Sequence, residues 1–163
     1  MISKALEDYH RAIELSRSIQ DYKQEAVTYG NIGVIHQQQG DLDQALDCYI
    51  KAVEIANSIG SKQIQTYYLG NLSTAYQAKG QRKEAIKAQQ ELLHISEITG
   101  NKRGQTFALS TIAGSLLEAG EFSQAISHYE QAIEIAEKHS IKNRLGTLNL
   151  NLSVVYHYLG DFK

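Results

Sequence analysis

The side chains that most often form catalytic and metal sites are scattered along this sequence. The chain has six histidines, which do not cluster, and His10, His94, His128 and His139 fall at different heights of the helices described below. It contains no HExxH motif and no paired cysteines, so the usual zinc-site patterns are absent. The single cysteine, Cys48, excludes an internal disulfide framework. We therefore predict no catalytic residue, no metal site and no cofactor.

One column of polar residues could bind another chain instead. Asparagine recurs at a spacing of about forty residues, with one threonine in the series: Asn31, Asn71, Thr111, Asn151. A side-chain amide offers both a donor and an acceptor, which is what an extended peptide backbone needs. Alternatively, these amides bond to one another along neighbouring helices. Which interpretation holds depends on the elements that carry the column.

Those elements are helices in a repeating pair. Two columns at the same period are occupied by small residues, namely Gly40, Gly80, Gly120 and Gly160, and Ala5, Ala45, Ala85 and Ala125. A fixed period of this length is typical of stacked supersecondary units. Apolar residues between 42 and 56 follow the i, i+3, i+4, i+7 spacing of an amphipathic helix. We name this helix B, and the helical pattern before it, from about 22 to 39, helix A.

The residues between the helices have the chemistry of helix ends. Gly40 can adopt the positive φ that closes a helix, and Asp41 with Gln44 forms a capping-box pattern that opens the next one. Small residues such as Gly33 and Ala45 are expected to let helices A and B approach closely. Each helical glycine costs roughly 1 kcal/mol relative to alanine, so a packing reason is expected for Gly33.

The column pattern resembles the tetratricopeptide repeat (TPR), in which a large residue, leucine, a small residue and an aromatic residue on helix A precede alanine, an aromatic residue and alanine on helix B. The matching residues in one repeat are Tyr29, Ile32, Gly33, His36, Ala45, Tyr49 and Ala52. There is no proline to close the unit, and the period is about six residues longer than the usual 34. Long repeats of this kind are similar to those of kinesin light chains, LGN and Pins adaptors and bacterial signalling proteins. The resemblance implies an all-α, right-handed superhelical solenoid of antiparallel helix pairs, with about eight helices.

The repeat pattern divides residues 1–163 of this single predicted solenoid into five parts. A half repeat with helix B only covers 2–20, full repeats cover 21–60, 61–100 and 101–140, and a half repeat with helix A only covers 141–163, its helix ending near 159. Both terminal faces look uncapped. We therefore predict head-to-tail self-association, a heterologous contact that need not close.

The second repeat departs from the other two. Gln89 stands where the other repeats have tyrosine, and Leu92 stands where they have alanine. One interpretation is volume compensation, because a core tolerates exchanges that keep its total volume. The other is a polar site near Gln89.

The TPR resemblance implies that the A helices line a concave groove and that the asparagine column points into it. The predicted partner-binding groove consists of Asn31, Asn71, Thr111, Asn151, Tyr67, Phe107, Val34, Thr74, Gln37 and Gln77. Tyr67 and Phe107 are the expected aromatic anchors, and the glycines beside them, such as Gly30, suggest room for a ligand. None of the groove columns supplies Lys or Arg, which disfavours the carboxylate clamp of chaperone-binding TPRs. The bases Lys62, Lys102, Arg103 and Lys142 are expected on the rim.

Composition narrows the class of partner. With 16 basic and 18 acidic residues the formal charge is −2, which argues against nucleic-acid and anionic-membrane surfaces. No signal-peptide pattern or membrane-length apolar run is present, so we expect a cytoplasmic protein. We predict a non-catalytic scaffold that binds a peptide or helix of a partner protein in its groove. The alternative is a sensor or regulatory module of a larger signalling protein that binds a small ligand or its own effector domain.

Overall fold

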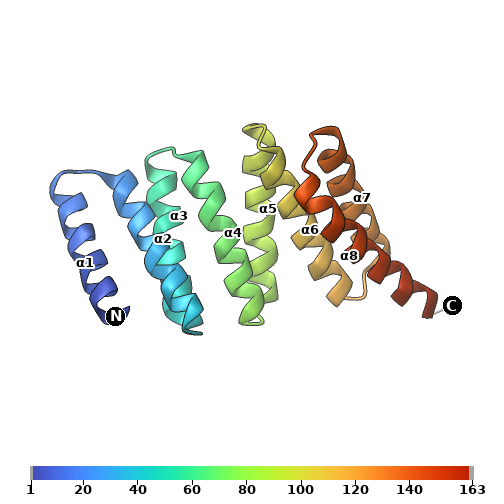
Figure 1. The fold of residues 1–163 in the computed structure, drawn as a ribbon, viewed down its shortest axis with the longest axis horizontal. Coiled ribbons are helices and arrows are strands. Elements are labelled where there is room, and N and C mark those ends of the chain that lie inside the picture. The colour runs from blue at the N-terminus through green and yellow to red at the C-terminus, as the bar shows by residue number, and fades with distance from the viewer. Residues whose placement is uncertain (1, 162–163) are drawn as a thin grey trace. The chain divides into compact units, whose positions relative to one another are not determined.

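The computed structural model describes residues 2–161, which form eight α-helices and no strand (Figure 1). The helices are α1 (Ile2–Ser18), α2 (Tyr22–Gln38), α3 (Leu42–Ser58), α4 (Lys62–Ala78), α5 (Arg82–Ile98), α6 (Lys102–Glu118), α7 (Phe122–Lys138) and α8 (Lys142–Asp161). The even-numbered helices are the predicted A helices, and the odd-numbered ones are the B helices. The all-α prediction is confirmed, and residues 162 and 163 of the last predicted half repeat lie outside the described residues.

Each three-residue turn closes one helix and opens the next. At the end of α2, Gly40 has φ +80°, its N–H donates to the carbonyl of Gln37, and the N–H of Asp41 donates to the carbonyl of His36. These two bonds form a Schellman motif. The Asp41 carboxylate then accepts the N–H of Gln44 at 3.2 Å, which caps α3. One residue therefore satisfies backbone groups of two helices.

Glycine is not present at every such turn. Gln20 and Ser140 occupy the left-handed conformation with φ of 57° and 55°, although Gly60 and Gly100 hold the corresponding positions of the full repeats. Gly160 is the opposite exception: it is a glycine in the turn column, yet it does not end its helix, because α8 continues through it to Asp161. The predicted end of this helix near residue 159 is therefore wrong. Glycine permits a positive φ but does not impose one.

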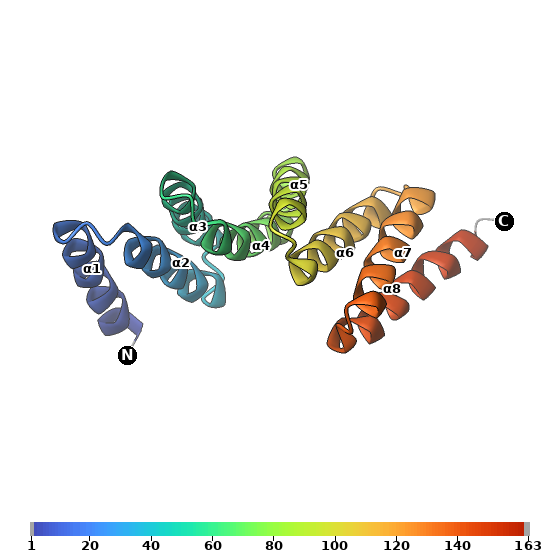
Figure 2. The same cartoon turned by 90° about the horizontal axis from the view of Figure 1, so that it is seen from above.

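The structure forms two compact units, Met1–Ala85 and Ile86–Lys163. In the first, α1 packs on α2, and α2 contacts both α3 and α4. Figure 2 shows α2 and α4 next to each other, and α3 lies beside both of them. In the second, α7 packs on α6 and α8, which also contact each other. The single solenoid over residues 1–163 remains a prediction of the repeat pattern.

The small-residue columns are where helices of a pair meet. A Cβ on Gly33 of α2 would lie 2.7 Å from the ring of Tyr49 and 3.2 Å from the carbonyl of Ala45. Ala45, Tyr49 and Ala52 are completely buried in α3. In the second unit, Ala125, Tyr129 and Ala132 of α7 are buried in the same way, with Leu109, Leu148 and Val155. The expected packing reason for Gly33 is thus the close approach of α3.

Candidate functional site

The amides of Asn31 and Asn71 lie on the neighbouring A helices α2 and α4 of the first unit. Both residues are half-buried, and the helices contact each other directly. Within residues 2–161, neither side chain forms a hydrogen bond with another protein group. The two amides therefore do not bond to each other along the helices, and their donors and acceptors are available to a ligand.

The two predicted aromatic anchors differ in accessibility. Tyr67 of α4 is 62% exposed, and its ring meets the ring of Tyr68 edge-on, with centroids 5.0 Å apart. Phe107 of α6 is half-buried, and the guanidinium carbon of Arg144 lies 5.0 Å from its ring centroid. Tyr67 can therefore contact a ligand directly, whereas the ring of Phe107 already contacts the guanidinium of Arg144.

The space beside Gly30 is filled by the protein itself. A Cβ at Gly30 would lie 1.9 Å from Cε1 and 2.0 Å from Cζ of Tyr68. The Tyr68 hydroxyl donates to the carbonyl of Val27 at 3.1 Å, so the ring crosses from α4 onto α2. The interpretation of Gly30 as room for a ligand is wrong, because this glycine makes room for Tyr68.

Other predicted groove residues are bonded inside the fold. The hydroxyls of Thr74 and Thr111 each donate to a backbone carbonyl of their own helix at 3.0 Å. The Oε1 atom of Gln37 accepts the hydroxyl of Tyr49 at 2.7 Å. These polar groups are thus already partly satisfied. The remaining two predicted residues, Val34 and Gln77, are half-buried.

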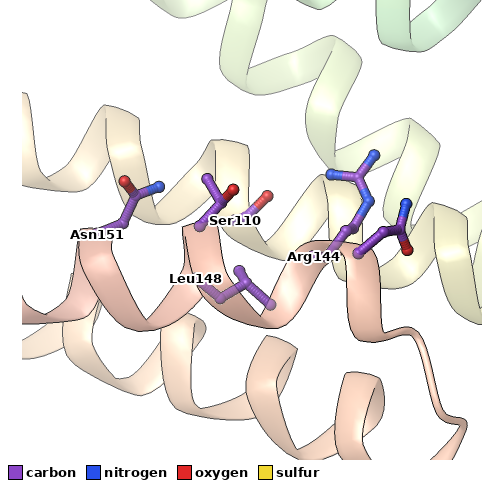
Figure 3. A pocket seen from close by; sticks show the side chains of 6 residues that line it. Ser110, Arg144, Leu148 and Asn151 are labelled. Carbon is purple, nitrogen blue, oxygen red and sulfur yellow. The ribbon is translucent and has the colours of Figure 1, made fainter.

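A pocket of about 200 Å³ lies between α6 and α8 in the second unit. It is lined by Ser110, Asn143, Arg144, Thr147, Leu148 and Asn151. Figure 3 shows Arg144, Leu148 and Asn151 on successive turns of α8, with Leu148 between the two polar side chains, and Ser110 coming from α6. Burial raises the pKa of Tyr129 on α7, and the neighbouring side chain of Asn151, as a hydrogen-bond partner, lowers it in part.

Arg144 was missed by the sequence analysis, which found no base in the groove columns. Arg144 nevertheless lines the same pocket as Asn151, although it belongs to none of the predicted groove columns. The column that holds Arg144 contains Gln24, Ile64 and Gly104 in the other repeats, and Ile64 is buried. An arginine at a position that holds an uncharged residue in the other repeats was the available signal.

The surroundings of Arg144 are unusual for an arginine. Burial lowers the pKa of Arg144, and the positive charge of Arg103 lowers it further. No carboxylate among the described residues forms an ion pair with Arg144. The site therefore holds a partly desolvated cation whose charge is not neutralised within the described part of the chain.

Gln89, the unusual residue of the second repeat, is completely buried. Its Oε1 accepts the hydroxyl of Ser115 at 3.5 Å, and its Nε2 has no partner among the described residues. Leu92 is also buried. An enclosed amide cannot meet a ligand at the surface, so the structure favours volume compensation here.

Among the described residues, no three His, Cys, Asp or Glu side chains gather closely enough to hold a metal ion. None of the helices, as far as they are described, has the length and apolarity needed to cross a bilayer.

Comparison with known proteins identifies the repeat. A sequence profile of the tetratricopeptide repeat family matches residues 3–58 and 62–138. A search of curated proteins finds no significant match.

Solved structures share the fold at low sequence identity. BtubC (BKLC) from P. vanneervenii gives a TM-score of 0.80 at 18% identity, over 97% of this chain and 66% of that one. The apo form of RapI gives a TM-score of 0.87 at 16% identity, over 96% and 57%. A kinesin light chain-like protein of Podosopora anserina with nearly identical TPR-like repeats gives 0.77 at 17% identity, over 98% and 80%. The chain thus spans less than two thirds of BtubC and RapI.

Proposed function

Because this chain belongs to the tetratricopeptide repeat family, we propose that it is a cytoplasmic scaffold that binds a peptide or helix of a partner protein along its A helices. Proteins of this family are generally interaction scaffolds rather than enzymes. The observation that carries the proposal is the pair of unbonded amides of Asn31 and Asn71 on adjacent helices, close in sequence to the exposed ring of Tyr67.

The chemistry of this surface suits a polypeptide. Two amides provide donors and acceptors for backbone groups, while an exposed tyrosine provides apolar contact area with a polar end. The formal charge of −2 gives no general attraction for nucleic acid, so we assign the surface to protein.

The test begins with proteins captured from the host lysate and identified by mass spectrometry. Asn31→Ala with Asn71→Ala removes both amides, and Asn57→Ala is the matched control because Asn57 is exposed on the B helix α3. A segment of the captured protein is then measured by calorimetry. Two lost hydrogen bonds predict roughly tenfold weaker binding by the double variant, with the control unchanged. Equal binding by wild type and double variant would refute the assignment to these amides.

A second candidate function is a sensor or regulatory module of a longer protein. The observation that favours it is that the match to this chain covers only 57% of RapI. A thermal shift produced by a small metabolite, and by no captured peptide, would favour this candidate over the scaffold.

We also propose that copies of this chain associate with one another. Leu150 is 65% exposed, and Val154, Tyr156 and Tyr158 on the same helix are also exposed, as are Leu15 on α1 and Ile19 after it. Contact between such surfaces on two copies would remove apolar area from water. We expect light scattering to show a mass that rises with concentration for the wild type and less for Leu150→Lys. A constant monomer mass at high concentration would exclude this contact.

A further inference from the structure

The face with which a B helix meets its A helix is accessible on α1. In α3 and α7 this face consists of two alanines around a tyrosine, each at most 2% exposed: Ala45, Tyr49 and Ala52, and Ala125, Tyr129 and Ala132. The corresponding residues of α1 have the same types at the same spacing but are only half-buried: Ala5, Tyr9 and Ala12. The helix α1 therefore presents the contact surface of a B helix without the cover that α2 gives to α3 and α6 gives to α7.

The complementary face of an A helix is accessible on α8. In the full repeats the small residue at the centre of this face is buried: Gly33, Ser73 and Ala113. Its counterpart in α8 is Ser153, which is exposed, and Tyr156 on the next turn is also exposed. The Ser153 hydroxyl donates to the carbonyl of Asn149 in its own helix at 2.8 Å. This face can therefore be covered without leaving the serine donor unpaired.

The contact between α2 and α3 shows how two such faces fit together. A Cβ on Gly33 would lie 2.7 Å from the ring of Tyr49 and 3.2 Å from the carbonyl of Ala45, so the A–B pair closes only around a small residue. In the second unit, Ala113 of α6 is buried in one cluster with Tyr129 of α7. The column thus accepts side chains up to about the size of serine, which is the residue that α8 carries.

We propose that α8 of one copy docks on α1 of a second copy, so that the two helices complete an A–B pair with Ser153 against Ala5 and Tyr9. This inference rests on the proposed self-association and specifies its geometry. Every copy carries both faces, so each meets a fitting partner at the protein's own concentration. Because the two faces differ, the contact is heterologous and need not close.

The exposure of Leu150 fits the same arrangement. Leu150 occupies the column of Gly30, whose neighbouring space is filled by the ring of Tyr68 from the next A helix. In the proposed contact the next A helix is α2 of the second copy. Its approach would cover Leu150, which is 65% exposed in a single copy, and would remove apolar area from water.

Single cysteines test the pairing directly. Ser153→Cys and Ala5→Cys are made in separate proteins, which are mixed in an oxidising glutathione buffer, and the products are identified by mass spectrometry. Cys48 is the one native cysteine and is buried, so it stays in place. We expect a disulfide between positions 153 and 5, because A and B helices approach closely at this column. Asn57→Cys, exposed on α3, is the matched control and is expected to form little mixed product with Ser153→Cys.

A second pair of variants measures the strength of the contact by light scattering. Ser153→Arg places a bulky side chain where α1 of the second copy would lie, and we expect it to weaken association roughly tenfold or more. Ser153 is exposed, so the variant is expected to keep its fold, which circular dichroism checks. Asn57→Arg makes a matched change outside the contact and is expected to associate like the wild type.

The outcomes separate this pairing from self-association in general. If the mass rises with concentration but Ser153→Arg has no effect, another surface makes the contact and the pairing of α8 with α1 is refuted. Disulfides of Ser153→Cys with itself, or with Asn57→Cys as readily as with Ala5→Cys, would refute it as well. A constant monomer mass refutes both proposals, and a disulfide from Ser153→Cys to a lysate protein would then assign this face of α8 to a different partner.

Discussion

Replacing Gly30 by alanine tests whether the A helices of the first unit are held together by Tyr68. In an open helical position this change stabilises a protein by roughly 1 kcal/mol, because glycine loses more backbone freedom on folding. At Gly30 the added Cβ would lie 1.9 Å from Cε1 of Tyr68. Relief to an ordinary carbon contact requires a shift of roughly 1.5 Å.

The ring cannot make that shift without loss. Tyr68 is only 3% exposed, its hydroxyl donates to the carbonyl of Val27 at 3.1 Å, and it stacks on Tyr49 with centroids 6.3 Å apart. Overpacking costs about 1–3 kcal/mol, and a broken hydrogen bond adds about 1 kcal/mol. After subtracting the helical gain, we expect Gly30→Ala to lower the free energy of unfolding by about 1–3 kcal/mol.

The assay is urea unfolding followed by circular dichroism. Gly146→Ala in α8 is the matched control, because no atom lies within 4 Å of its added Cβ, and we expect it to stabilise by roughly 1 kcal/mol. In a Tyr68→Ala background the penalty of Gly30→Ala is expected to vanish. A Gly30→Ala protein as stable as wild type, or an equal penalty in both backgrounds, would refute the reasoning.

Three further outcomes are expected. Ser140→Gly is expected to raise the free energy of unfolding by about 1 kcal/mol, because Ser140 has φ 55° and a left-handed conformation strains side-chain-bearing residues; an unchanged urea midpoint would contradict this. Gln89→Leu is expected to stabilise by about 1 kcal/mol, because it removes a buried amide nitrogen without a partner among the described residues, and a loss of stability would reveal a bond to that nitrogen. Burial raises the pKa values of Tyr49 and Tyr68 to about 12. Because these folded-state pKa values exceed the ordinary value of 10, the native state retains the protons, and stability present below pH 10 is lost as the pH rises towards 12. The slope for each tyrosine is at most about 1.4 kcal/mol per pH unit; Tyr49→Phe is expected to reduce it, and stability independent of pH in this range would contradict the burial argument.

The helices and their ends were predictable from the sequence because their causes are local. The positive φ of Gly40 and the cap from Asp41 to Gln44 act within a few residues. The failures at helix ends are local as well: Gln20 and Ser140 adopt a positive φ without being glycine, and Gly160 remains helical. The residue type sets the free-energy cost of a positive φ. The surrounding contacts decide whether the residue adopts that conformation.

The candidate site was only partly predictable. The repeat pattern predicted that Asn31 and Asn71 share one face of the A helices. The structure places them on two neighbouring helices, where their side chains form no hydrogen bond with the described residues. Their role in binding stays a proposal. Gly30 was misread because the ring that fills its space belongs to the next repeat. Arg144 was missed because its column lies outside the predicted groove columns and holds uncharged residues in the other repeats.

By itself, the sequence determined the period, the all-α class and the helix pairs, since these follow from residue spacing and from interactions along one chain segment. Only the tertiary structure decided which groups remain available for binding. Whether Tyr68 fills the space at Gly30, and whether Arg144 meets Phe107 beside a pocket, depends on side chains of different helices. Such contacts depend on how helices pack, which no single column of residues encodes.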